Sequence, residues 1–142
     1  MEVSVYLDAS VLVALLTVEP LSGRADNFIA STREPLIVSD LASAEFSSAI
    51  ARRVRMRETT RAEARADLAD FDLWTMRSAQ RTELAPIDIA AATTYLRRLD
   101  LPLRTPDAIH IAIALRIGAT LVTFDRQMAV SARALGSTVE TP

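Results

Sequence analysis

The chain opens with an apolar segment that runs directly into a helix through an aspartate. Residues 3–7 are mostly β-branched, aromatic or aliphatic, which predicts a short buried strand. Apolar residues resume at helical spacing from Val11 to Leu16. Asp8 lies between the two, and in open α/β sheets ligands bind at the carboxyl ends of the strands. Asp8 is therefore either a helix cap or part of a site.

The same strand-to-helix unit recurs along the chain, with strands at 36–38 and 120–124. Alternation of strands and helices predicts an α/β fold with a central, mainly parallel sheet and helices on both faces. No linker or repeat interrupts the pattern, so we expect one domain over residues 1–142. The other predicted segments are helices at 21–31, 41–57, 59–81, 88–99, 106–117 and 126–135, an extended piece at 84–87 and an edge strand at 137–139. The helices at 41–57 and 59–81 are expected to form a hairpin.

Composition excludes several classes of protein. The sequence has no cysteine, so disulfide frameworks and thiolate metal sites are excluded, and the cytoplasm is the expected location. No apolar run approaches the roughly 18 residues needed to span a bilayer, so no membrane partner is expected. The net charge of −2 gives no sign of nucleic-acid binding.

The distribution of basic residues is more informative than the net charge. All 16 are arginines, because the chain has no lysine. One cluster of arginines is either a solvated helix face or a surface that binds the phosphates of a nucleic acid, for which the guanidinium group is well suited. Within it we predict Arg53 and Arg57 as nucleic-acid contacts. The members of the cluster are Arg52, Arg53, Arg55, Arg57, Arg61 and Arg65.

Four acids stand out by position. Asp8 and Asp125 each end a strand, and Asp107 lies in the first turn of an apolar helix. Each of these three is explained by capping or by the helix dipole, which contributes roughly 0.3–1 kcal/mol. Glu45 has no such role and lies beside the apolar stripe of its helix. Since strand ends and helix starts meet at one edge of a parallel sheet, we expect the four acids to converge.

Converging carboxylates require a cation or protons. Two carboxylates about 5 Å apart repel by roughly 3 kcal/mol at an effective dielectric constant of 20. Oxygen ligands without cysteine favour Mg²⁺, with Mn²⁺ as the alternative, over Zn²⁺. One or two such ions activate water and neutralise a phosphodiester during hydrolysis.

Three further residues have more than one interpretation. Ser10 and Thr123 either orient the carboxylates or cap helices. His110 is the only histidine and shares a helix face with Asp107. We interpret it as a packing residue and leave it out of the predicted chemistry.

Four segments resemble the acidic motifs of PIN domains, most closely those of VapC-type ribonuclease toxins from bacterial toxin–antitoxin pairs. The resemblance covers nearly the whole chain and implies a three-layer α/β/α fold with a helical hairpin. The segment after the fourth acid, residues 126–128, is less charged than is usual in the family. The motifs are Tyr6-Leu7-Asp8-Ala9-Ser10, Ser43-Ala44-Glu45-Phe46, Thr105-Pro106-Asp107-Ala108-Ile109-His110-Ile111-Ala112 and Val122-Thr123-Phe124-Asp125-Arg126.

The resemblance also implies an activity and partners. It implies a magnesium-dependent endoribonuclease with Asp8 and Asp107 as direct metal ligands, and with Glu45 and Asp125 acting partly through water. It implies a homodimer that binds RNA, and a cognate antitoxin that occupies a groove between helices and places a basic side chain against the acids.

Other functions compete with this interpretation. Receiver domains and haloacid-dehalogenase-like phosphatases also have acidic pockets at strand ends, but both resemblances require a lysine that this chain lacks. A second alternative is a housekeeping nuclease of the same fold, which the sequence does not exclude. A binding module without catalysis is the other alternative, although four intact acids, with their mutual repulsion, argue against it.

Overall fold

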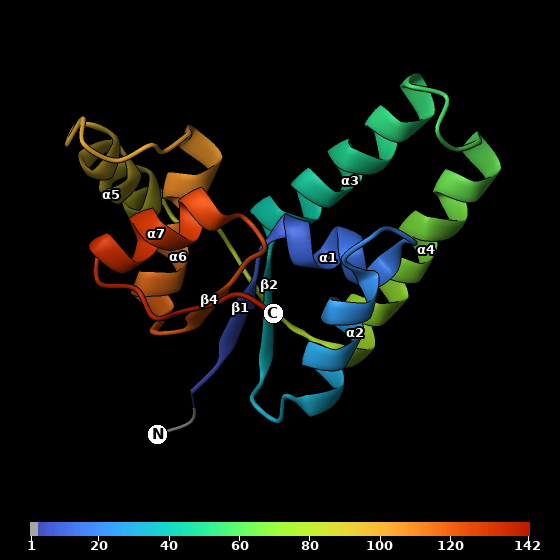
Figure 1. The fold of residues 1–142 in the computed structure, drawn as a ribbon, viewed down its shortest axis with the longest axis horizontal. Coiled ribbons are helices and arrows are strands. Elements are labelled where there is room, and N and C mark those ends of the chain that lie inside the picture. Colours follow the sequence, from blue (N-terminus) through green and yellow to red (C-terminus); the bar gives the residue numbers. More distant parts are fainter. Residues whose placement is uncertain (1–2) are drawn as a thin grey trace.

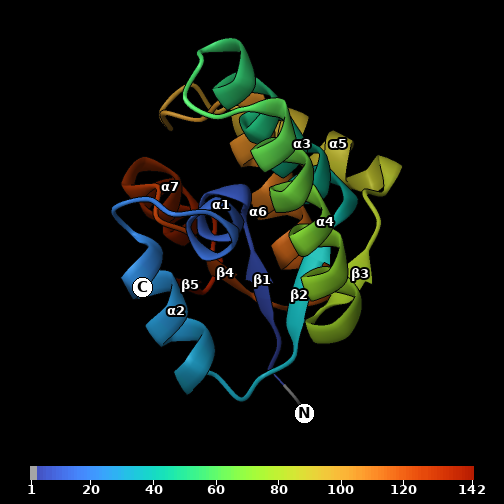
Figure 2. The same ribbon diagram turned by 90° about the vertical axis from the view of Figure 1, so that its right-hand side faces the viewer.

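The computed structural model describes residues 3–142, and these contain a five-stranded sheet. The strand order is β3-β2-β1-β4-β5 and every neighbouring pair is parallel (Figure 2). Parallel pairing places the carboxyl ends of all strands at one edge of the sheet. The strands are β1 (Val5–Leu7), β2 (Leu36–Ser39), β3 (Gln80–Thr82), β4 (Thr120–Val122) and β5 (Val139–Glu140).

Helices cover both faces of the sheet. Figure 1 shows α1 to α4 on one side of the strands and α5 to α7 on the other. The predicted three-layer α/β/α architecture is therefore confirmed. The helices are α1 (Ala9–Leu16), α2 (Ser22–Ser31), α3 (Asp40–Arg55), α4 (Arg61–Ser78), α5 (Pro86–Leu96), α6 (Thr105–Ile117) and α7 (Arg126–Ala134).

The alternation of side chains in β1 divides the core into two parts. Val5 and Leu7 pack into the cluster formed with α1 to α4, while Tyr6 packs into the cluster formed with α5 to α7. All three residues are buried. Because β1 is covered on both faces, its near-continuous apolar sequence follows directly from its central place in the sheet.

The predicted hairpin of α3 and α4 is present and projects beyond the sheet (Figure 1). The rings of Phe46 and Phe71 stack across it with centroids 4.2 Å apart. Thr60 and Glu63 form a capping box at the start of α4. The hairpin is thus fixed at its base by aromatic packing and at its turn by the cap.

One strand was missed by the sequence analysis. We predicted a helix to Arg81, but α4 ends at Ser78 and residues 80–82 form β3, which pairs with β2. This edge strand consists of polar residues with largely exposed side chains. It therefore lacks the apolar alternation by which strands are recognised, and only backbone pairing with β2 defines it.

The start of the following helix was also predicted wrongly. Residues 84–87 were expected to be extended, but α5 begins at Pro86, and proline suits the first turn of a helix. Asp88, the predicted first residue of the helix, lies inside that turn. Its carboxylate still caps the helix, because Oδ2 accepts a hydrogen bond from the Ala85 N–H at 2.8 Å.

Two other helix ends differ from the prediction. The helix predicted at 88–99 ends earlier than expected: Leu99 lies beyond the end of α5, has a φ of 67° and is 91% exposed. The next helix was predicted to begin at Pro106, with Thr105 just before it. Thr105 is the first helical residue instead, and Arg104 occupies the cap position without a side-chain hydrogen bond.

Within residues 3–142, no helix combines the length and the apolar character required to cross a membrane.

Candidate active site

Asp8 lies where β1 meets α1, at the carboxyl edge of the sheet. Its Oδ1 accepts a hydrogen bond from the Val11 N–H at 3.2 Å, so Asp8 caps α1. The residue is only 5% exposed. A carboxylate this deeply buried needs hydrogen bonds or a cation to compensate for its lost hydration.

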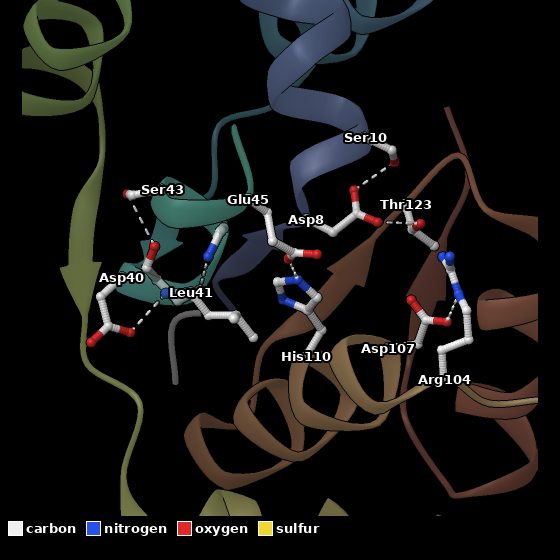
Figure 3. A network of polar contacts seen from close by, with 12 residues as sticks. Asp8, Ser10, Asp40, Leu41, Ser43, Glu45, Arg104, Asp107, His110 and Thr123 are labelled. Atoms are coloured by element: carbon white, nitrogen blue, oxygen red, sulfur yellow. Dashed lines mark hydrogen bonds and ion pairs between the residues drawn. The ribbon is translucent and has the colours of Figure 1, made fainter. Parts of the chain in front are cut away.

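Two hydroxyl groups also donate to Asp8. Ser10 Oγ donates to Oδ1 at 2.6 Å, and Thr123 Oγ1 donates to Oδ2 at 2.5 Å (Figure 3). Burial raises the pKa of the Asp8 carboxyl, against the lowering effect of these two hydrogen bonds. Ser10 and Thr123 therefore orient this carboxylate, which is one of the two interpretations that the sequence offered.

Glu45 lies on α3 and its side chain is 32% exposed. Its Oε1 is paired with Nε2 of His110 from α6 (Figure 3). The other ring nitrogen, Nδ1, lies 2.6 Å from the hydroxyl of Tyr6, whose pKa is raised by burial. His110 is 2% exposed, as expected of a packing residue, but it also contacts a predicted site residue.

The sequence analysis therefore undervalued His110. Its spacing of three residues from Asp107 already placed both on one helix face. Its partner Glu45 is 65 residues away in the chain, and no local pattern predicts that contact.

The remaining two acids each lie at the start of a helix. Asp107, in the first turn of α6, accepts a hydrogen bond at 3.3 Å from Nε of Arg104. Asp125 caps α7, because its Oδ1 accepts from the Met128 N–H at 3.1 Å. The Asp125 N–H in turn donates to Thr123 Oγ1 at 3.0 Å.

These contacts join the acids into separate groups, and within the described part of the chain Asp107 contacts only Arg104. His110 of α6 pairs with Glu45 of α3. Thr123 bonds to both Asp8 and the backbone of Asp125. Within residues 3–142, however, no three acidic or histidine side chains lie close enough together to form a ready-made metal site. Each acid is instead turned toward its own partner in the protein.

An open cleft of about 910 Å³ leads away from this edge. Ser10 and Glu45 line its acidic end, and Arg52, Arg53 and Arg104 line its walls. Of the four predicted acids only Glu45 lines this space, where it lies with four arginines and with two other glutamates, Glu19 and Glu58.

The two predicted RNA-contacting arginines differ in position. Arg53 is half-buried in the wall of the cleft. Arg57 is exposed in the turn after α3, has a φ of 57°, and is outside the set of described residues that line the cleft. The structure therefore brings only Arg53 near the acids.

A comparison with protein families matches residues 5–133 to the PIN domain. The matched segment runs from β1 into α7 and includes all four acids and His110. The chain belongs to the PIN domain family.

The chain is also similar to individual known proteins. The chain is 34% identical over 142 residues to "Ribonuclease VapC46" of Mycobacterium tuberculosis, covering 98% of both proteins. The fold is similar to that of M. tuberculosis VapC20, described as a sarcin-ricin loop cleaving toxin, with a TM-score of 0.74 and 19% identity over 90% of this chain and 95% of that one. A DNA-bound VapBC structure from Salmonella typhimurium gives a TM-score of 0.71 and 17% identity, with 98% of each chain covered.

The chemistry of the four predicted ligands suits a magnesium ion, although within residues 3–142 their spacing does not form a metal site. All four predicted ligands are carboxylates, the donor type that Mg²⁺ prefers. Within residues 3–142, Glu45 Oε2, Asp107 Oδ1 and Asp125 Oδ2 have no hydrogen-bond partner. Asp8 Oδ2 accepts only from Thr123, so it retains one acceptor position. Each acid thus has an oxygen available to a cation without losing its present contact.

Proposed function

We propose that this PIN domain is a Mg²⁺-dependent endoribonuclease that hydrolyses RNA phosphodiester bonds as the toxin of a toxin–antitoxin pair. The observation that carries the proposal is the cleft that joins Glu45 and the surroundings of Asp8 to a wall of arginines. The Glu45 carboxylate, with Asp8 behind Ser10, suits a cation, and guanidinium groups along the wall suit phosphates. The 34% identity to a ribonuclease, over nearly the full length of both chains, supports the same activity.

Some residues of the chain bind the RNA, and others orient the carboxylates. Arg52 and Arg53 neutralise phosphates along the cleft and hold the RNA backbone in register. Ser10 and Thr123 fix the Asp8 carboxylate. Asp8 and Asp107 would hold Mg²⁺ directly, and Glu45 and Asp125 partly through water. When bound, the ion supplies an activated water and neutralises charge on the phosphate.

We also propose two protein partners. A cognate antitoxin is supported by the similarity to a VapBC assembly and by the family resemblance of the motifs. A homodimer is expected on the same resemblance. A cytoplasmic location stays a prediction from the absence of cysteine.

A housekeeping nuclease of the same fold is the alternative with the same chemistry, and it differs only in its RNA and partners. A binding module without turnover is disfavoured because each of the four acids keeps an available oxygen.

Cleavage of a radiolabelled total RNA preparation tests the proposal. We expect cuts with added Mg²⁺ and none after chelation with EDTA. Asp8→Asn and Asp107→Asn each remove one carboxylate oxygen while keeping the size of the side chain, so we expect cleavage to fall at least a hundredfold, about 2.7 kcal/mol in the barrier. Circular dichroism should show an unchanged fold.

Asp100→Asn is the matched control, since Asp100 forms an exposed ion pair with Arg98 and is outside the set of described residues that line the cleft. It should cleave as the native protein does. Native activity in Asp8→Asn or Asp107→Asn, or activity independent of divalent cations, contradicts the proposal.

A further inference from the structure

A chain of polar side chains runs through the core to Glu45. Ser39 Oγ lies 2.6 Å from the Tyr6 hydroxyl, which lies 2.6 Å from His110 Nδ1. His110 Nε2 then pairs with Glu45 Oε1 (Figure 3). Ser39, Tyr6 and His110 are buried, while Glu45 reaches the cleft. The chain therefore connects the N-cap of α3 with an acid of the candidate site.

The hydrogen-bond directions along this chain can be assigned from the Ser39 end. Ser39 Oγ accepts from the Ala42 N–H at 3.0 Å, as the N-cap of α3. The Ser39 hydroxyl then donates its own proton to the Tyr6 oxygen, which is the other hydrogen-bond partner of Ser39 Oγ within residues 3–142. If Tyr6 donated to Ser39 instead, the Ser39 proton would be buried without an acceptor, at a cost of about 1–3 kcal/mol.

The assignment at Ser39 fixes the tautomer of His110. A tyrosine hydroxyl carries its proton at neutral pH, and with Ser39 donating to Tyr6, that proton has His110 Nδ1 as its acceptor. The ring proton of the neutral imidazole is then on Nε2 and points to Glu45. This arrangement satisfies the donors and acceptors that link Ser39, Tyr6, His110 and Glu45.

We propose that His110 is a positioning residue for RNA cleavage, which holds the Glu45 carboxylate through an Nε2–H hydrogen bond in a tautomer set by Tyr6 and Ser39. This inference rests on the proposed nuclease function. Glutamate has three flexible side-chain torsions, and fixing them costs up to about 2 kcal/mol. His110 is the hydrogen-bond partner of the Glu45 carboxylate within residues 3–142, so its loss frees that side chain.

Variants at His110 provide the kinetic test. His110→Met keeps the bulk of the side chain but removes both polar contacts, so kcat should fall about 10–100-fold, as when hydrogen bonds to metal-binding groups are lost. KM for RNA should stay the same, because the arginines of the cleft are untouched. His110→Gln retains an N–H donor for Glu45 and should recover much of the lost kcat.

Ile111→Val is the matched control, because Ile111 is buried in the same helix and belongs to the neighbouring core. It should lose stability without losing kcat in the folded protein. Native kcat in His110→Met, or a His110→Gln variant as slow as His110→Met, overturns the proposal.

A spectroscopic test requires no variant and no nuclease activity. Since His110 is the only histidine, the ring ¹⁵N resonances of untagged native protein belong to it alone. We expect a long-range ¹H–¹⁵N spectrum at neutral pH to show the neutral Nε2–H tautomer. An Nδ1–H tautomer or a doubly protonated ring overturns the proposal. A native protein that shows the Nε2–H tautomer but cuts no RNA refutes the nuclease function and leaves the hydrogen-bond assignment intact.

Discussion

At the scale of single residues, Asp8 shows how hydrogen bonds favour the ionised form of a buried carboxylate. Three donors reach it, from Ser10, Val11 and Thr123. Burial would otherwise favour the protonated form, and these hydrogen bonds work against that preference. Because Thr123 belongs to the segment after β4, the orientation of Asp8 depends on pairing between β1 and β4.

Thr123→Val removes one of these donors with little change in shape. A hydrogen bond to a charged group contributes about 1.5–3 kcal/mol, so we expect RNA cleavage to fall roughly tenfold or more. Initial cleavage rates and thermal melting would measure the effect. Ser47→Ala is the control, because the Ser47 hydroxyl donates to the Ser43 carbonyl on the exposed side of α3. Equal rates for native protein and Thr123→Val would show that Asp8 needs no such orientation.

At the scale of secondary-structure elements, α6 serves both the candidate site and the fold. Its first turns contribute Asp107 and His110, and its last turn contributes Arg116. Arg116 Nε donates at 2.7 Å to Asp88 of α5, a residue only 1% exposed. The ion pair joins the two helices that lie together on one face of the sheet and so fixes the helix that carries the site residues.

This pair should make stability depend on pH. Burial raises the pKa of Asp88, but hydrogen bonds from Arg116 and the Ala85 N–H outweigh it and hold the pKa below its ordinary value. Stabilisation by the ionised group is therefore present above the unfolded pKa of about 3.9 and is lost as the pH falls through the lower folded pKa. Asp88→Asn should cost about 3 kcal/mol at neutral pH, the low end for a broken buried pair because Arg116 is partly exposed.

Urea unfolding of native protein and Asp88→Asn between neutral pH and pH of about 3 would measure this difference. The difference in unfolding free energy between native protein and Asp88→Asn should become smaller as the pH falls. Asp100→Asn, which breaks the exposed pair with Arg98, should have little effect at any pH. A gap that stays constant with pH would contradict the role assigned to Asp88.

At the scale of the whole molecule, charge is distributed unevenly. The net charge of −2 would repel RNA, yet the cleft at Glu45 is lined by four arginines against three glutamates. Over a Debye length of about 10 Å, local charge dominates over net charge. The molecule is thus able to bind a polyanion in one place while staying weakly acidic overall.

Arg53→Ala should weaken RNA binding and change its salt dependence. Each phosphate contact to single-stranded RNA contributes about −0.7 to the slope of log K against log salt, so the slope should become shallower by about that amount. Fluorescence anisotropy with labelled RNA over a range of salt concentrations measures the slope. Arg33 precedes β2 at the opposite edge of the sheet, and Arg33→Ala should leave the slope unchanged. Arg57→Ala, from outside the cleft, should have a smaller effect than Arg53→Ala. An unaltered slope for Arg53→Ala would make Arg53 a solvated surface residue.

The sequence predicted most of the fold where burial leaves a strong pattern. β1, β2 and β4 are buried and apolar, and each was recognised. β3 was missed because its polar, largely exposed side chains carry no such pattern. Helix ends were wrong where residues within the first turn, rather than the N-cap, shaped the start of the helix, as at Pro86.

The sequence also determined which chemistry is available, because the positions of the four carboxylates and the absence of lysine and cysteine are properties of the chain itself. Only the tertiary structure decided how those groups are held. Glu45 meets His110, and Asp8 meets Thr123, across 65 and 115 residues of chain. Local periodicity describes which face of an element is buried, but contacts at such separations arise only when parallel strands bring their carboxyl ends to one edge.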